Sequence, residues 1–325
     1  MLKIFKYFIF LFFLSCGRSE LDVELTETTP EINFLHYDKE LFETPVNEIP
    51  VIIDSLALKY PVFISGNYNN ASQISQLGAY IKNPLNQKLY QEAEAKLGGL
   101  ANAETIIQEG FGYFNYYFPQ KKLPNVYFYI SGLNYEEPII IADSVNIIVG
   151  KDLFLGSDYL IYDQYQIPKF VSQNFDIRFL PYQLFRKYSY SLFKENLTDK
   201  SLLEVMVALG KTEFLINAMF PQSKVQDRFA FNQNQIEWME NRERSFWKYL
   251  AEENYLFNTD FHEYKKFIED RPFISSLERD SPGRAGIYIG YKIVREYMRN
   301  TNTTLAELMN NKDYMMIYKL SKYNP

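Results

Sequence analysis

Two histidines and one cysteine are the only residues of their types in this chain of 325 residues. A zinc hydrolase helix needs two histidines four residues apart with a glutamate between them, and His36 and His262 stand far apart in the sequence. No Gly-x-Ser-x-Gly turn is present for a serine nucleophile. We therefore expect both histidines at the surface, His262 in the first turn of a helix, and we expect no catalytic residue, no metal site and no cofactor.

Carboxylates are the remaining candidates for acid and base chemistry. The chain contains close pairs at Glu92/Glu94, Glu136/Glu137 and Glu252/Glu253. A glycosidase-type site needs two carboxylates that converge in space, and nothing in these spacings indicates convergence. In an acidic protein such pairs are typical of solvated helix faces and turns, so we expect no acid/base dyad.

Three glycines near the C-terminus, Gly283, Gly286 and Gly290, could be read as a phosphate-binding loop. Such a loop follows a strand and ends in Lys-Ser/Thr, and neither is present here. Gly286 and Gly290 are one helical turn apart, so they share one face of a helix. Their small size predicts that a neighbouring helix approaches closely at this face.

Cys16, the only cysteine, follows a short basic and apolar N-terminus. Lys3 and Lys6 precede an apolar run over 7–14 that is too short to span a bilayer, and small residues flank the cysteine. This pattern is typical of a lipoprotein signal peptide, with Cys16 as the lipidated first residue of the mature protein. An ordinary secretory signal with an incidental cysteine is the alternative. The lipoprotein pattern predicts a protein of the cell envelope that faces the periplasm, on either membrane.

The chain divides into a signal peptide over 1–15, a flexible acidic tether over 16–31 and one globular domain over 32–325. Cleavage would remove Lys3 and Lys6 and no acidic residue, so the net charge of −6 would become −8. This acidity disfavours nucleic acid and anionic membrane surfaces as partners, because both require a basic footprint.

The domain is expected to be α+β, mostly helical with a small antiparallel sheet near 125–150. Strands are predicted at 126–130, 138–142 and 145–149, where β-branched and aromatic runs are bounded by turn residues. Helices are predicted at 71–98 with a break at Pro84, 103–118, from 201 onward, 232–257, 284–299 and from 304 onward. Ser201 and Glu204 fit a capping box at the start of one of these helices.

Four blocks of the mature chain form a recognisable series: 148–156, 202–221 followed by Trp238 and Trp247, 281–298, and 321–325. The first reads Ile-Val-Gly-Lys-Asp-Leu-Phe-Leu-Gly and the third begins Ser-Pro-Gly-Arg-Ala-Gly-Ile-Tyr-Ile-Gly-Tyr. In this order they resemble the GldB family of gliding-motility lipoproteins from Bacteroidetes-type bacteria, most specifically at 281–298. The resemblance implies a lipoprotein required for gliding over surfaces. It also implies that the gliding machinery is linked to the type IX secretion system.

The same blocks are more distantly similar to a family of predicted zinc peptidases, which carry His-Glu-x-x-His on one helix and a Glu-Gly ligand motif on the next. The corresponding segments here are 180–188, without histidine or glutamate, and 207–211, where Leu209 takes the ligand position. Leucine cannot bind zinc, and its helical spacing from Val205 and Met206 predicts that it faces the core. This resemblance implies a zincin-like scaffold that has lost its metal.

Two classes of function remain open. The first is a non-catalytic lipoprotein, anchored by its lipid, that contacts proteins of the gliding and type IX machinery or acts as an assembly chaperone. Its candidate interaction surface is Arg284, Tyr291 and Arg295, because such residues are enriched at recognition surfaces. Alternatively, the two arginines pair with acids such as Asp280 and Glu296. The second class is a cell-envelope peptidase or glycan hydrolase with a non-standard site, which bound zinc or converging carboxylates in a cleft would favour.

Overall fold

The computed structural model describes residues 30–97 and 100–325. The predicted signal peptide, Cys16 and most of the predicted tether lie outside the described residues. The N-terminal elements are β1 (Phe34–His36), α1 (Tyr37–Glu43), α2 (Ile49–Lys59), α3 (Ala71–Lys82), α4 (Pro84–Leu97) and α5 (Ala101–Tyr117). Next come β2 (Asn125–Tyr129), β3 (Ile139–Asp143) and β4 (Asn146–Gly150).

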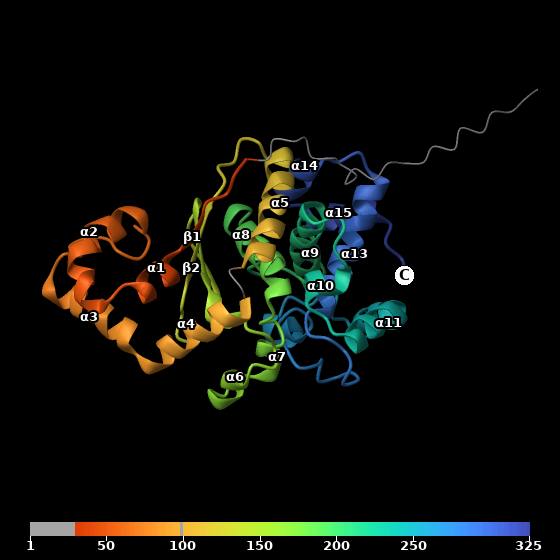
Figure 1. Cartoon of the computed structure of the whole chain (residues 1–325). Helices are drawn as coiled ribbons and strands as arrows, with labels where there is room; N and C mark the ends of the chain where they lie inside the picture. Colours follow the sequence, from red (N-terminus) through yellow and green to blue (C-terminus); the bar gives the residue numbers. More distant parts are fainter. Residues whose placement is uncertain (1–29, 98–99) are drawn as a thin grey trace, which may run out of the picture.

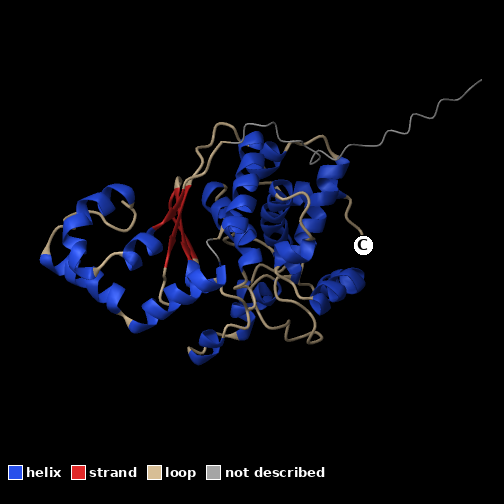
Figure 2. Cartoon of the chain, in the orientation of Figure 1, coloured by secondary structure: helices blue, strands red, loops and turns tan. Residues whose placement is uncertain are grey.

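The C-terminal part of the chain is helical. Its elements are α6 (Leu160–Gln164), α7 (Lys169–Ser172), α8 (Leu180–Leu192), α9 (Leu202–Met219), α10 (Val225–Phe229), α11 (Gln233–Glu252), α12 (Phe261–Tyr264), α13 (Ala285–Asn300), α14 (Leu305–Asn310) and α15 (Tyr314–Ser321). The sheet lies between two groups of helices, with α1 to α3 on one side and α5, α8, α9 and α13 on the other (Figures 1 and 2). The predicted α+β class with mostly helical content is confirmed.

The sheet is mixed, which corrects the prediction of an antiparallel one. Its order is β1-β2-β4-β3, and only β3 and β4 are antiparallel, whereas β2 runs parallel to both β1 and β4. The physical reason is that β4 inserts between β2 and β3 after the short turn that follows β3. β3 is therefore left at one edge of the sheet and β1 at the other.

Side chains alternate between the two faces of the sheet, as the period of two in a strand requires. Val126 and Phe128 of β2 lie next to Ile147 and Val149 of β4 and are buried in a large core formed with the C-terminal helices. Tyr127, between them, belongs to a smaller core that is closed by α1, α2 and α3. The sheet thus separates two distinct hydrophobic cores.

Helices α9 and α13 cross at the centre of the larger core. A Cβ atom built on Gly290 would lie 1.7 Å from the carbonyl oxygen of Met206, and one built on Gly210 would lie 2.2 Å from the carbonyl carbon of Gly290. The two backbones therefore touch at a point where no side chain fits. The close helix approach predicted from Gly286 and Gly290 is confirmed.

Local signals set most helix boundaries as predicted. Asn83 has an extended backbone before Pro84, so the predicted helix divides there into α3 and α4. Ser201 and Glu204 form the predicted capping box at the start of α9, with each side chain bonded to the other residue's backbone. Among the described residues, no helix combines the length and the apolar character that crossing a membrane requires.

Candidate functional site

An open cleft of about 250 Å³ lies between the edge strand β3 and helix α8. Residues in and after α7 and residues in the segments that precede α11 and α13 also line it. Its charged and amide side chains are Glu136, Gln183, Arg186, Lys187, Asp270 and Arg284. The cleft therefore gathers residues from segments that are far apart in the sequence.

Helix α8 forms one wall of this cleft. Gln183, Arg186, Lys187 and Tyr190 line the cleft and follow the spacing i, i+3, i+4, i+7, so they share one helix face. Apolar positions between them, such as Leu184, are buried in the larger core. The burial of one face of α8 thus directs the opposite, polar face into the cleft.

Arg186 of α8 forms a two-point ion pair with Glu213 of α9. Its Nε donates to Oε1 at 2.6 Å and its Nη2 donates to Oε2 at 2.9 Å, while Nη2 also donates to the carbonyl oxygen of Arg228 at 2.7 Å. The Glu213 side chain is fully buried and that of Arg186 is 12% exposed. Burial alone would lower the pKa of Arg186, but the Glu213 carboxylate outweighs it and raises the pKa above its ordinary value.

Arg284 reaches the same cleft from the loop before α13. Its backbone is left-handed, with φ of 58°, directly before the first residue of the helix. Its Nε lies 2.9 Å from Oδ1 of Asp270, and its Nη2 donates to the carbonyl oxygen of Phe229. A Cβ on the preceding Gly283 would lie 2.6 Å from the backbone nitrogen of Arg271, so the loop packs too closely for another residue. Arg284 is therefore held in a fixed position.

A third arginine, Arg228, lies behind the cleft and is 4% exposed. Its Nη1 donates to the carbonyl oxygen of Ser223 at 2.8 Å and its Nη2 to the Tyr291 hydroxyl at 3.3 Å. Within the described residues it forms no ion pair, and its Nε has no hydrogen-bond partner. Burial lowers the pKa of Arg228, with Tyr291 and Glu213 opposing that effect. Arg228 thus places a buried guanidinium, without an ion-pair partner in the described chain, behind the cleft.

Tyr190 adds a hydroxyl group to the cleft. Burial of this hydroxyl raises the pKa of Tyr190 to about 12, with Glu213 reinforcing the shift and Arg186 and Arg284 opposing it. Its ring is partly exposed, with the whole residue 36% accessible. No hydrogen bond to this hydroxyl is formed within the described part of the chain, so it is available to a ligand.

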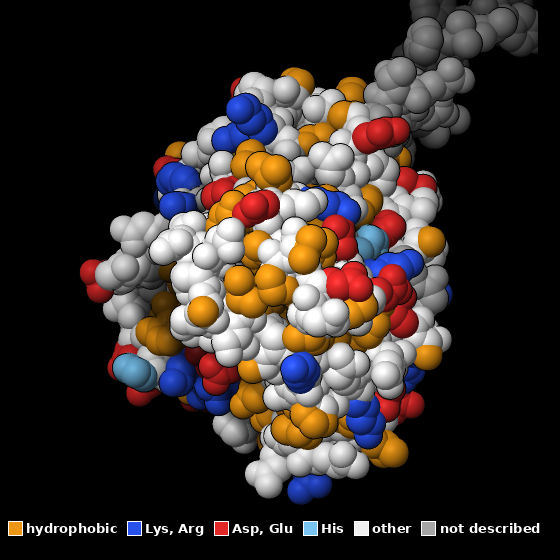
Figure 3. Space-filling view, turned by 60° about the vertical axis from the view of Figure 1, so that its left-hand side comes forward, with side chains coloured by type: hydrophobic (Ala, Val, Ile, Leu, Met, Phe, Trp, Pro, Cys, Tyr) orange, Lys and Arg blue, Asp and Glu red, His pale blue; other side chains and the backbone are white. Residues whose placement is uncertain are grey.

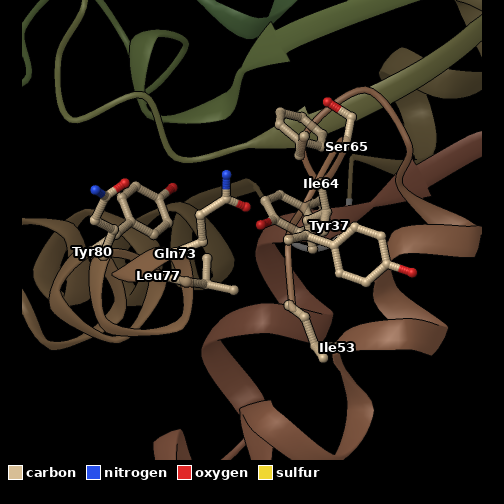
Figure 4. A pocket seen from close by; sticks show the side chains of 10 residues that line it. Tyr37, Ile53, Ile64, Ser65, Gln73, Leu77 and Tyr80 are labelled. Atoms are coloured by element: carbon tan, nitrogen blue, oxygen red, sulfur yellow. The ribbon is translucent and has the colours of Figure 1, made fainter. Parts of the chain in front are cut away.

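A second cavity, of about 380 Å³, lies in the smaller core between α1, α2 and α3 (Figure 4). It is lined by aromatic, aliphatic, amide and hydroxyl groups, which include Tyr37, Phe63, Ser65, Tyr68, Gln73 and Tyr80. None of its lining residues carries a charge at neutral pH. The two cavities thus differ in chemistry and belong to different cores.

The three residues predicted to form an interaction surface lie in different environments. Arg284 lines the cleft, whereas Tyr291 is 3% exposed and faces the interior. Arg295 is half-buried, with its guanidinium 5.9 Å from the centre of the Tyr291 ring and its Nε 3.7 Å from Glu296. The predicted pairing with Glu296 is present, and Arg284 pairs with Asp270 instead of Asp280. Their role in binding remains a prediction, and only Arg284 reaches the cleft.

The two histidines also differ in their surroundings. His262 is exposed in the first turn of α12, as predicted. His36 is half-buried instead of lying freely at the surface, with its Nε2 2.9 Å from Glu104 and its ring stacked on Phe128 at 5.1 Å. The nearby strand β2 and helix α5 thus hold His36 in place.

Sequence reasoning missed the Arg186–Glu213 pair. It placed Leu209 at the position that corresponds to a zinc ligand in the similar peptidases, and Leu209 is half-buried against the larger core. The signal that could have found the pair was the charge of Lys211 and Glu213 in the mostly apolar helix α9, because a buried charge needs a partner. Across residues 30–97 and 100–325, no group of three or more His, Cys, Asp or Glu side chains is placed to hold a metal ion.

Comparison with known proteins assigns the family. No curated protein and no solved structure matches the chain, so the zincin-like scaffold is not confirmed. The family described as gliding motility protein GldB matches residues 18–325, which is nearly the whole chain. The chain therefore belongs to the GldB family and is a gliding motility lipoprotein.

Proposed function

We propose that this lipoprotein is non-catalytic and acts by binding a protein of the gliding and type IX secretion machinery in the cleft between β3 and α8. A lipid on Cys16 would attach it to a membrane of the cell envelope, with the domain facing the periplasm. The role of the domain in gliding would then be to hold or position its partner.

The Arg186–Glu213 pair is the observation that supports this proposal most strongly. A general base or a metal ligand needs a carboxylate that a substrate or a metal can reach, and Glu213 is fully buried with both oxygens facing Arg186. Asp270 likewise faces Arg284. Carboxylates that are paired in this way are suited to fixing arginines in a binding site.

Deletion of the gene in the source bacterium tests the role in the machinery. Single cells filmed on glass should stop gliding, and the wild-type gene should restore movement. Secreted proteins in the medium should decrease in the same strain if the partner belongs to the type IX system. Normal gliding and normal secretion in the deletion strain would refute the proposal.

The proposal that the protein is not an enzyme is tested with the mature lipoprotein extracted in detergent. Peptide and cell-wall glycan substrates should remain intact, with and without added Zn²⁺. Cleavage that is lost in a folded Glu213→Gln variant would show that the cleft is an active site.

Cys16→Ala tests the anchor. The protein should remain folded and move from the membrane fraction to the soluble fraction, because no other lipidation site is predicted. Retention of the substituted protein in the membrane fraction would count against lipidation at Cys16.

A further inference from the structure

The open edge of the sheet lies directly beside the cleft. The backbone N–H of Gly150 donates to the carbonyl oxygen of Pro138 at 2.9 Å, which identifies these two as a hydrogen-bonded antiparallel pair. Because such pairs alternate along a ladder, Ile140 bonds to Ile148, while Ile139 and Ile141 turn their N–H and C=O groups away from β4. No strand pairs with the outer edge of β3 among the described residues. The outward backbone groups of Ile139, which is 3% exposed and lines the cleft, and of the half-buried Ile141 therefore have no strand partner in the described part of the chain.

The cleft also carries an excess of positive charge in an acidic protein. Arg186, Lys187, Arg228 and Arg284 lie in or behind it, against the carboxylates of Glu136, Glu213 and Asp270. Lys187 is exposed and forms no ion pair within the described chain. The Nη1 atoms of Arg186 and Arg284 and the Tyr190 hydroxyl likewise have no hydrogen-bond partner in the described structure. These donors are arranged to receive a carboxylate.

We propose that the occupant of the cleft is an extended, acidic segment of the partner protein, which adds a strand to the outer edge of β3 and places a carboxylate against Arg186, Lys187 and Arg284. This inference rests on the proposed function and names the kind of partner segment. Backbone hydrogen bonds to Ile139 and Ile141 would supply affinity, and the charged groups would select acidic sequences. A neutral strand lacks the carboxylate, and a helix cannot pair with the backbone of β3.

Photo-cross-linking in living cells tests this proposal. A benzoylphenylalanine is introduced at Ala142, an exposed residue of β3, and separately at Glu252 on the exposed surface of α11 as a control. Illumination should cross-link one envelope protein at Ala142 and not at Glu252. Mass spectrometry should map the cross-link to a short segment that contains Asp or Glu.

Two substitutions, each made in the protein that carries the cross-linker at Ala142, test strand addition and charge selection separately. Ile141→Pro removes one outward N–H and leaves the hydrogen bonds to β4 in place, and it should reduce cross-linking at least tenfold. Lys187→Glu reverses one unpaired charge and should reduce cross-linking by a similar factor. If Ile141→Pro does not fold, hydrogen exchange replaces it, and the β3 amides should become protected in the isolated complex with the partner.

The outcomes distinguish this inference from the proposed function. Cross-linking that is unaffected by Ile141→Pro, or β3 amides that remain unprotected in the complex, would show that the partner does not add a strand. Cross-linking that is unaffected by Lys187→Glu would show that charge does not select it. Either result overturns the inference and leaves a binding role of the cleft intact. No cross-link at Ala142 in gliding cells would also overturn the inference, and a binding role of the cleft would again stand, because Ala142 lies in β3 and is not one of the residues that line the cleft.

Discussion

The sheet separates two cores that differ in how closely their helices pack. In the larger core, a Cβ on Gly290 of α13 would lie 1.7 Å from a backbone oxygen of α9. In the smaller core, a Cβ on Gly78 of α3 would lie 3.3 Å from a methyl group of Val46. The first contact involves backbone atoms that cannot move independently, whereas a small shift of one valine relieves the second. At these two points, the helices of the larger core therefore pack more closely than those of the smaller core.

The cavities of the two cores differ in the same way. The cleft beside the larger core contains arginines that are fixed by ion pairs and by backbone carbonyls, whereas the cavity in the smaller core has no charged lining. A binding site keeps its geometry only if its donors are held to within roughly 0.5 Å by the surrounding structure. Of the two cavities, the cleft beside the larger core is therefore the one with fixed charged groups that can hold a ligand, and this is where we place partner binding.

The sharpest test of the difference in packing is a single added methyl group. Gly290→Ala should destabilise the domain by more than about 3 kcal/mol, because the Cβ forces two helix backbones apart. Gly78→Ala should change stability by less than about 1 kcal/mol, because the higher helix propensity of alanine offsets slight crowding. Urea unfolding measures both variants. Similar losses of stability in the two would contradict the packing difference.

Breaking the buried ion pair should have the next largest effect. Glu213→Leu leaves Arg186 buried without a counter-charge and should cost about 3–5 kcal/mol of unfolding free energy. The double variant Arg186→Met/Glu213→Leu should recover most of that loss, because both charges are then absent. Glu252→Ala, in the exposed pair with Lys248, is the control and should cost at most about 0.5 kcal/mol. A double variant as unstable as Glu213→Leu would show that packing, and not charge, sets the cost.

The acid dependence of the unfolding free energy should also differ between the two sides of the sheet, but by less than the effects above. Glu195 lies beside the larger core. Burial alone would raise the pKa of Glu195, but hydrogen bonds from Lys211, Lys312 and Tyr314 outweigh it and lower the pKa below its ordinary value of 4.5. Because the pKa is lower in the folded chain than in the unfolded chain, this stabilisation is complete above about pH 4.5 and is lost as the pH falls through the folded value. Glu195→Gln should therefore flatten the decline of unfolding free energy in acid.

The matched variant for this titration is Glu40→Gln, beside the smaller core. Glu40 also has a lowered pKa, because hydrogen bonds from Lys59 and Tyr60 outweigh its partial burial. Its side chain is 34% exposed against 9% for Glu195, so solvent screens its interactions more strongly. Its substitution should change the acid dependence less. A larger change for Glu40 than for Glu195 would contradict this order.

Much of the fold could be predicted from the sequence because its signals are local. The break before Pro84, the capping box of Ser201 and Glu204, and the small residues Gly286 and Gly290 act within one or two helical turns. The direction of the strands could not be predicted, because the insertion of β4 between β2 and β3 depends on pairing across the whole sheet.

The cleft was harder to predict than the fold. Arg284 was identified from its place in the C-terminal block, but its partner Asp270 and the Arg186–Glu213 pair were not. Each of these contacts joins segments that only the tertiary structure brings together. Tyrosines are enriched at recognition surfaces, but Tyr291 is buried, because its position in α13 faces α9 and α10.

The most direct test of partner binding in the cleft is gliding by the deletion strain complemented with matched single-charge variants. Lys187→Glu places a negative charge in the cleft, and Gln73→Glu places one in the uncharged cavity of the smaller core. Both positions are exposed, so both proteins should fold and accumulate to wild-type levels. We expect cells with Lys187→Glu to lose gliding and cells with Gln73→Glu to glide at wild-type speed. Normal gliding with Lys187→Glu, or its loss with Gln73→Glu alone, would contradict charge-dependent binding of a partner in the cleft.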